Sequence, residues 1–236
     1  MAAQAGDGMN LFDYLSDPAN WQGEAGIGYL LLQHLGYTAA AVVIACVIAI
    51  PLGILIGHTG RGSFLLIGLG NAARAIPSLG LLVLIVLLLG TGNGPIIGVL
   101  AVLALPPILT STAAGIRGAD RDAVHAARAL GMSGSQVIRQ VEWPLALPLV
   151  ISGVRSATLQ VVATATIAAY SSGTGLGRLL ISGNANRNYS QMFAGALIVA
   201  LLAIVLDVAL GALAWLTARR RHAPNKTVGA ALAVST

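Results

Sequence analysis

Long stretches without charged residues alternate with short polar segments along this chain. No Asp, Glu, Lys or Arg occurs at residues 25–60, 75–116, 156–177 or 188–206. A helix needs about 20 apolar residues to cross ~30 Å of hydrocarbon, so each stretch is long enough for one crossing. The stretch at 75–116 is long enough for two crossings, and residues 91–95 (TGNGP) in its middle have the composition of a turn. The pattern therefore predicts five membrane-spanning helices.

The predicted spans lie at about 34–57, 74–91, 95–116, 144–170 and 193–217. The apolar segment 63–72 is too short to cross a bilayer by itself. It is an interfacial helix, an N-terminal extension of the second span, or a sixth span. We therefore expect an all-α polytopic membrane protein with five main transmembrane helices, or six if this segment crosses.

The composition excludes most soluble classes of protein. Hydrophobic residues make up 56% of the chain and charged residues 9%, whereas a soluble domain carries about 25% charged residues. The single cysteine, Cys46, cannot form an internal disulfide. Disordered chains, collagen and disulfide scaffolds are therefore excluded, and an integral membrane protein remains.

The distribution of charge predicts the orientation in the cell membrane. All 13 Lys and Arg residues follow position 60, whereas residues 1–60 carry four acidic residues. Because basic loops stay in the cytoplasm, five spans place segment 1–28 outside and the tail 219–236 inside. The transmembrane domain is then 29–218, and the tail, which has no periodic pattern, is expected to be disordered. Because basic and aromatic residues are not interleaved, the high isoelectric point indicates topology and not nucleic-acid binding.

The loop at 117–143 is the longest polar stretch between the spans, and its regularity predicts two helices. Small and apolar residues recur at i, i+3, i+4 and i+7, on one face of a helix: Ala123, Ala126, Ala127 and Leu130. Gly131 follows, where the end of a helix favours a left-handed residue. Residues 133–136 (SGSQ) resemble a capping box that begins the second helix. Such a helix pair either lies on the membrane or docks on a partner.

This loop also carries a family resemblance. The segment AARALG, with a proline thirteen residues after its glycine and WPLALPLVISGVRSA around that proline, resembles the permease signature of binding-protein-dependent ABC importers. That signature is Glu-Ala-Ala, a glycine, and Leu-Pro further on. The matching residues are Ala126, Ala127, Gly131 and Pro144, and the departures are His125 at the glutamate and Trp143 before the proline.

Three further segments resemble the osmoprotectant branch of this family, which takes up glycine betaine, carnitine, choline or proline betaine. They are residues 75–82, 164–169 and 175–178, and the resemblance covers roughly 30–220. A methionine-type amino-acid importer is the closest alternative. A stand-alone channel or secondary transporter would be supported by inverted repeats, which the sequence lacks. An intramembrane enzyme would need a second ionisable partner for Asp207, and only Arg155 is available.

The resemblance implies the fold and the partners. The fold is the five-helix type I importer core, used as a dimer, in which 117–143 is a cytoplasmic coupling loop. The partners are cytosolic ATP-binding subunits, an extracytoplasmic substrate-binding protein, a second permease subunit (identical or paralogous) and membrane lipid. The chain has no G-x-x-x-x-G-K-[ST] phosphate loop, so a separate subunit must hydrolyse ATP. We expect no enzymatic activity, catalytic residue, metal or cofactor, and we expect the glycine-rich residues 173–177 to form a flexible outer loop that meets a docking protein.

The candidate functional residues fall into two groups. Those assigned to ATPase coupling are Ala123, Ala126, Ala127, Leu130 and Gly131, with Trp143 and Pro144 anchoring the next span. Those assigned to the translocation path are Pro77, Ser78, Arg155, Thr164, Thr166 and Asp207. Ionisable residues inside a membrane are functional candidates, but a structural role for Asp207, with Arg155 or a helix backbone as its partner, is the favoured interpretation. Two G-x-x-x-G motifs, at 53–57 and 94–98, predict close helix packing.

Overall fold

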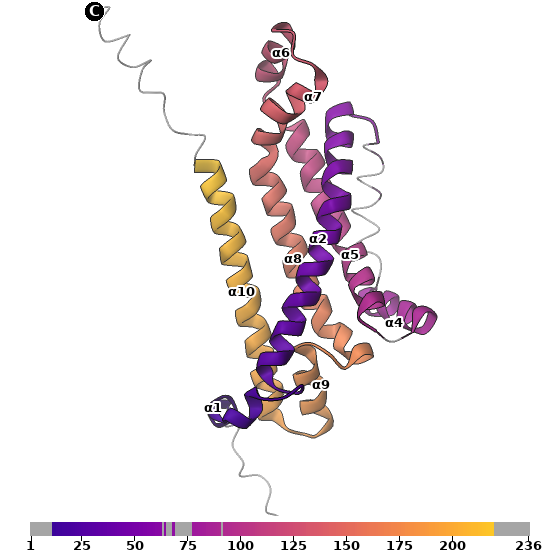
Figure 1. Cartoon of the computed structure of the whole chain (residues 1–236), viewed down its shortest axis with the longest axis vertical. Coiled ribbons are helices and arrows are strands. Elements are labelled where there is room, and N and C mark those ends of the chain that lie inside the picture. The colour runs from indigo at the N-terminus through magenta and orange to yellow at the C-terminus, as the bar shows by residue number, and fades with distance from the viewer. Residues whose placement is uncertain (1–10, 63, 65–67, 69–76, 91, 220–236) are drawn as a thin grey trace, which may run out of the picture.

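The computed structural model describes residues 11–62, 64, 68, 77–90 and 92–219, and every regular element among them is helical (Figure 1). In chain order the elements are α1 (Leu11–Ser16), η1 (Pro18–Trp21), α2 (Ile27–Thr59), α4 (Ser78–Leu89), α5 (Asn93–Arg117), α6 (Arg121–Ala129), α7 (Gly134–Val137), the π-helical turn η2 (Ile138–Glu142), α8 (Trp143–Ser172), α9 (Gly177–Ala185) and α10 (Tyr189–Arg219). The predicted all-α class is confirmed.

Four helical segments are long and apolar enough to cross a membrane. They are Ile27–Thr59, Asn93–Arg117, Gly134–Tyr170 and Tyr189–Thr217. They include the first, third, fourth and fifth predicted spans, although the first helix begins earlier than expected. The second span is described only as α4, whose 12 residues rise about 18 Å and do not cross the bilayer alone. Most of the predicted segment 63–72 and the tail after Arg219 lie outside the described residues.

The helices α2 and α5 run in the same direction through the bundle. The hydroxyl of Tyr37, in the first half of α2, donates to Oδ1 of Asn93, the first residue of α5, over 2.9 Å. At their other ends, a Cβ built on Gly57 would lie 2.6 Å from Ile116 Cβ. The two helices are therefore parallel and end at the same end of the bundle (Figure 1). α8 runs in the opposite direction and α10 runs parallel to α2 again (Figure 1), so the described helices provide four crossings.

Small residues allow these helices to approach closely. A Cβ on Gly53 or Gly57 would lie 2.6 Å from a side-chain atom of Thr112 or Ile116 on α5. Close backbone approach of this kind favours helix association in lipid. Lipid tails are as apolar as the helix side chains, so van der Waals packing and not the hydrophobic effect draws the helices together. The G-x-x-x-G prediction is confirmed at 53–57. It is wrong at 94–98, because a Cβ on either glycine would meet no atom of the described chain within 4 Å.

The glycine-rich segment 173–177 is packed, and the prediction that it is flexible is wrong. Gly175, Leu176 and Gly177 are buried. The Gly175 N–H donates to Gln33 Oε1 on α2 over 3.2 Å. A Cβ on Gly177 would lie 2.0 Å from the carbonyl oxygen of Thr166, so only glycine fits against α8 there. The segment therefore holds α9 against α2 and α8.

Candidate functional site

The loop between α5 and α8 folds as two helices joined by a glycine turn. Asp120 caps α6 by accepting the Asp122 N–H over 2.9 Å. After α6, Gly131 has φ 81°, as its predicted left-handed role requires. Ser133 and Gln136 then form the predicted capping box: the Ser133 N–H donates to Gln136 Oε1 over 2.7 Å, and the Gln136 N–H donates to Ser133 Oγ over 3.4 Å. The loop is thus an ordered unit at one end of the bundle (Figure 1).

The residues predicted to form one coupling face of α6 differ in their exposure to solvent. Ala127 is buried, with 5% of its surface exposed, and Ala123 is half-buried. Ala126 is exposed, and Leu130, at the C-terminal end of α6, is 84% exposed. A partner could therefore reach Ala126 and Leu130, whereas Ala127 packs inside the protein. The expectation that Ala127 offers its side chain to a partner is corrected accordingly.

A buried acid–histidine pair attaches this unit to the bundle. His58, in the last turn of α2, donates from Nδ1 to Glu142 Oε2 over 2.7 Å. Glu142 is buried at the end of η2, and single π-helical turns occur often at functional sites. Neither residue was singled out from the sequence, because 84 positions separate them. The available signal was that Glu142 is the only acid between Asp122 and Asp207.

The next span is anchored directly after this pair. Pro144 is the second residue of α8 and follows the π-helical turn η2 inside the continuous helical segment Gly134–Tyr170. Because proline has no N–H to donate, the helix lacks one backbone hydrogen bond at this point. Trp143 packs against a cluster of Ile116, Ala146 and Val150. The role of Trp143 and Pro144 as anchors of this span stays a prediction.

Within the membrane, α8 and α10 are joined by an ion pair. Arg155 donates from Nε to Asp207 Oδ1 and from Nη2 to Asp207 Oδ2, both over 2.5 Å. A Cβ on Gly211, one turn after the acid, would lie 3.3 Å from Arg155 Nη1, so the glycine makes room for the guanidinium. A planar guanidinium matches a carboxylate in this two-bond geometry. Of the two structural partners considered for Asp207, Arg155 is the one that the structure shows.

Comparison with known proteins identifies the family. Residues 49–220, more than half of the chain, match the family described as binding-protein-dependent transport system inner membrane component. The chain belongs to this permease family. It is a multi-pass membrane protein and a transporter subunit.

Alignments with individual relatives cover most of the permease. It is 34% identical over 178 residues to the glycine betaine/carnitine/choline transport system permease protein OpuCB of Bacillus subtilis, covering 75% of this chain and 82% of that one. It is 35% identical over 181 residues to the carnitine transport permease protein OpuCB of Listeria monocytogenes, covering 77% and 83%. It is 34% identical over 204 residues to the osmoprotectant import permease protein OsmW of Salmonella typhimurium, covering 84% and 93%.

Among solved structures, the permease resembles the MetNI methionine ABC transporter in its inward-facing native CY5 crystal form. The TM-score is 0.70 at 21% identity, covering 81% of this chain and 95% of that chain. At this identity the likeness concerns the fold alone. It confirms the type I importer core that the sequence predicted.

In the described part of the chain, two of the six residues assigned to the translocation path, Arg155 and Asp207, are in direct contact. Pro77 precedes the first residue of α4, Ser78. The hydroxyls of Thr164 and Thr166 donate to carbonyls one turn earlier in α8, over 2.8 and 3.0 Å. Among the six candidates, the described contacts include one ion pair, that of Arg155 with Asp207. Their joint role in a path stays a prediction.

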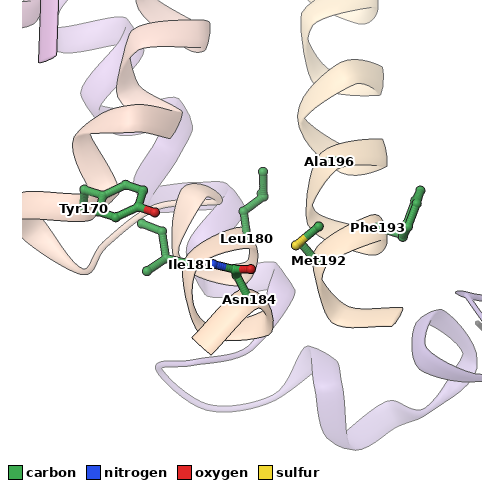
Figure 2. Close-up of a pocket in the computed structure, with 7 residues that line it drawn as sticks. All are labelled: Tyr170, Leu180, Ile181, Asn184, Met192, Phe193 and Ala196. Carbon is green, nitrogen blue, oxygen red and sulfur yellow. The ribbon is translucent and has the colours of Figure 1, made fainter. Parts of the chain in front are cut away.

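A hollow of about 310 Å³ lies at the opposite end of the bundle from the α6–α7 unit, between the end of α8, α9 and the start of α10 (Figure 2). Its lining is mostly apolar and consists of Tyr170, Leu180, Ile181, Asn184, Met192, Phe193 and Ala196. An aromatic cage for a quaternary ammonium needs ring faces turned toward one cation. The rings of Tyr170 and Phe193 lie far apart and do not face each other in Figure 2, so this hollow is not such a cage.

Proposed function

We propose that this permease forms half of the membrane pathway of an ATP-driven importer for an osmoprotectant such as glycine betaine, carnitine, choline or proline betaine. The observation that carries the proposal is identity of about one third, over most of both chains, with permeases named for glycine betaine, carnitine and choline. A methionine-type amino-acid importer is less well supported, because the likeness to the methionine transporter is 21% identical. The second permease subunit, identical or paralogous, supplies the other half.

The α6–α7 unit is the proposed docking element for a cytosolic ATP-binding subunit. It extends beyond the ends of the long helices (Figure 1) and carries an exposed Leu130 beside the exposed Ala126. A large apolar side chain exposed at the tip of a polar loop is suited to burial in a groove of a partner. Because the chain has no phosphate loop, that partner supplies ATP hydrolysis.

Movement of this unit would reach two spans by different contacts. Gly134–Tyr170 is one long helical segment, so a displacement of α7 is carried along η2 into α8. The bond between Glu142 and His58 joins the same segment to the end of α2. We infer that ATP-driven movement of the docked unit tilts α8 and α2 together, which opens the pathway alternately to the two sides.

We propose that the α6–α7 unit is cytoplasmic and that α1 is extracytoplasmic, because basic residues gather at the α6 end. Single cysteines at Ser16 and Ser135, both exposed, in a Cys46→Ala background should react with an impermeant thiol reagent from opposite sides of the membrane. Intact cells should label position 16, and position 135 should label only after the membrane is opened. Labelling of both positions in intact cells would contradict the orientation.

The substrate is tested by transport. The permease, reconstituted into proteoliposomes with its ATP-binding and substrate-binding subunits, should accumulate radiolabelled glycine betaine, carnitine or choline only when ATP is supplied. The same vesicles given labelled methionine provide the matched control and should not accumulate it. ATP-dependent uptake of methionine without uptake of any of these osmoprotectants would replace the proposal with the amino-acid alternative.

A further inference from the structure

A cleft of about 360 Å³ opens where α2 and α5 end beneath α6. Its lining comes from four elements and includes the final residues of α2, the end of α5, one face of α6, and Glu142 on η2. The basic side chains that line it are Arg117, Arg121 and Arg128, and two histidines, His58 and His125, lie beside them. A volume of this size is within the range of sites that hold small molecules or headgroups, roughly 300–1,000 Å³.

The cleft carries an excess of positive charge. Glu142 is the one acid in its lining, and its carboxylate already accepts the bond from His58. Asp120 and Asp122 are close in sequence, but neither lines the cleft, and the Asp120 carboxylate caps the N-terminus of α6. Arg121 and Arg128 therefore line a cleft whose one carboxylate is hydrogen-bonded to His58, and this arrangement favours an anionic ligand.

Helix dipoles do not explain all three arginines. Arg117 is in the last turn of α5 and Arg128 in the last turn of α6, where basic residues compensate the negative end of a helix. Arg121 is in the first turn of α6, where a positive charge is unfavourable. Within the described part of the chain, neither Arg121 nor Arg128 has an acidic partner within ion-pair distance. A guanidinium offers a planar set of donors that matches phosphate oxygens in two-bond geometry.

The position of the cleft indicates where the phosphate comes from. Gly57 and Ile116, the apolar ends of two packed spans, form its floor, and polar α6 covers it. This is the depth at which a membrane protein meets lipid headgroups, and basic pockets between transmembrane helices bind anionic headgroups. We propose that this cleft binds the phosphodiester of an anionic phospholipid, with Arg121 and Arg128 as the principal donors.

The test compares lipid retention by matched charge variants. Permease purified from membranes with its accompanying subunits is placed in nanodiscs of phosphatidylcholine with a minor fraction of phosphatidylglycerol, re-extracted, washed, and analysed for bound lipid by mass spectrometry. Wild type should retain phosphatidylglycerol over phosphatidylcholine. Removal of each arginine near an anionic lipid should weaken retention about fivefold, so Arg121→Gln/Arg128→Gln should lose about twenty-five-fold. Arg139→Gln is the control, because Arg139 is exposed on the same loop unit outside the cleft.

Three results would overturn the proposal. The first is an equal loss in Arg139→Gln, which would indicate general attraction of lipid to the basic end. The second is displacement of the retained lipid by millimolar inorganic phosphate with no preference for the lipid, which would make free phosphate the ligand. The third is retention by the permease alone but not by the complex with its ATP-binding subunits, which would assign the cleft to the subunit interface. Nanodiscs expose both leaflets, so the outcome does not depend on the proposed orientation or substrate.

Discussion

Leu130→Asp should remove ATP-driven uptake while the permease remains folded in the membrane. Leu130 is 84% exposed, so its replacement changes no internal packing. Burial of a leucine side chain at an interface contributes about 1.5–3 kcal/mol, and its loss should weaken association with the ATP-binding subunit by roughly one to two orders of magnitude. The measurements are co-purification of that subunit and uptake in proteoliposomes.

Two further variants serve as controls for Leu130→Asp. Leu130→Met keeps an apolar side chain of similar volume and should retain most of the uptake. Ala127→Trp should act differently, since Ala127 is buried and a large side chain there disturbs the loop itself. Its effect should therefore appear in the thermal stability of the purified permease. Uptake at the wild-type level in Leu130→Asp would show that the exposed tip of α6 does not carry the coupling contact.

His58→Ala should lower the stability of the permease more than Glu142→Gln does. Loss of the histidine leaves the Glu142 carboxylate buried without its hydrogen-bond donor, whereas glutamine carries no charge that needs compensation. Breaking a buried pair from one side costs about 3–5 kcal/mol, and the lower end applies because the His58 side chain is 19% exposed. The measurement is the thermal unfolding of the purified permease in detergent.

The double variant His58→Ala/Glu142→Gln completes the cycle. It should be more stable than His58→Ala alone, because the uncompensated charge has been removed. In uptake assays, both single variants should also reduce transport, since the pair joins α2 to the segment that enters α8. Additive losses in the double variant, without any recovery, would mean that the two residues do not act as a unit.

Local features of the loop could be predicted because their causes are local. The capping box at Ser133 and Gln136 and the left-handed Gly131 involve bonds and backbone angles within a few residues. Their physical requirements are therefore visible in the order of residues alone. The short helices α1 and α9 were not predicted, because neither is long enough to show a clear period.

Contacts between distant segments could not be predicted in the same way. The motif at 53–57 and the motif at 94–98 have the same spacing, yet only the first faces another described helix. Which face of a helix contacts a neighbour is set by the rotation of the whole helix about its axis, and that rotation depends on all of the surrounding helices. For the same reason Ala127 and Leu130 were placed on one face, while the structure buries the first and exposes the second.

By itself, the sequence determined the all-α membrane class, the positions of the four long spans and the choice of Arg155 as a candidate partner for Asp207. Stretches without charged residues mark the spans, because a charge inside hydrocarbon is costly. The same cost favours an ion pair between two opposite charges that lie at similar depth. Only the tertiary structure decided that His58 holds Glu142, that residues 173–177 are packed, and that three arginines of two helices surround one cleft. These depend on where helix ends meet in space, and many arrangements of the same five spans would satisfy the pattern of polar and apolar residues equally well.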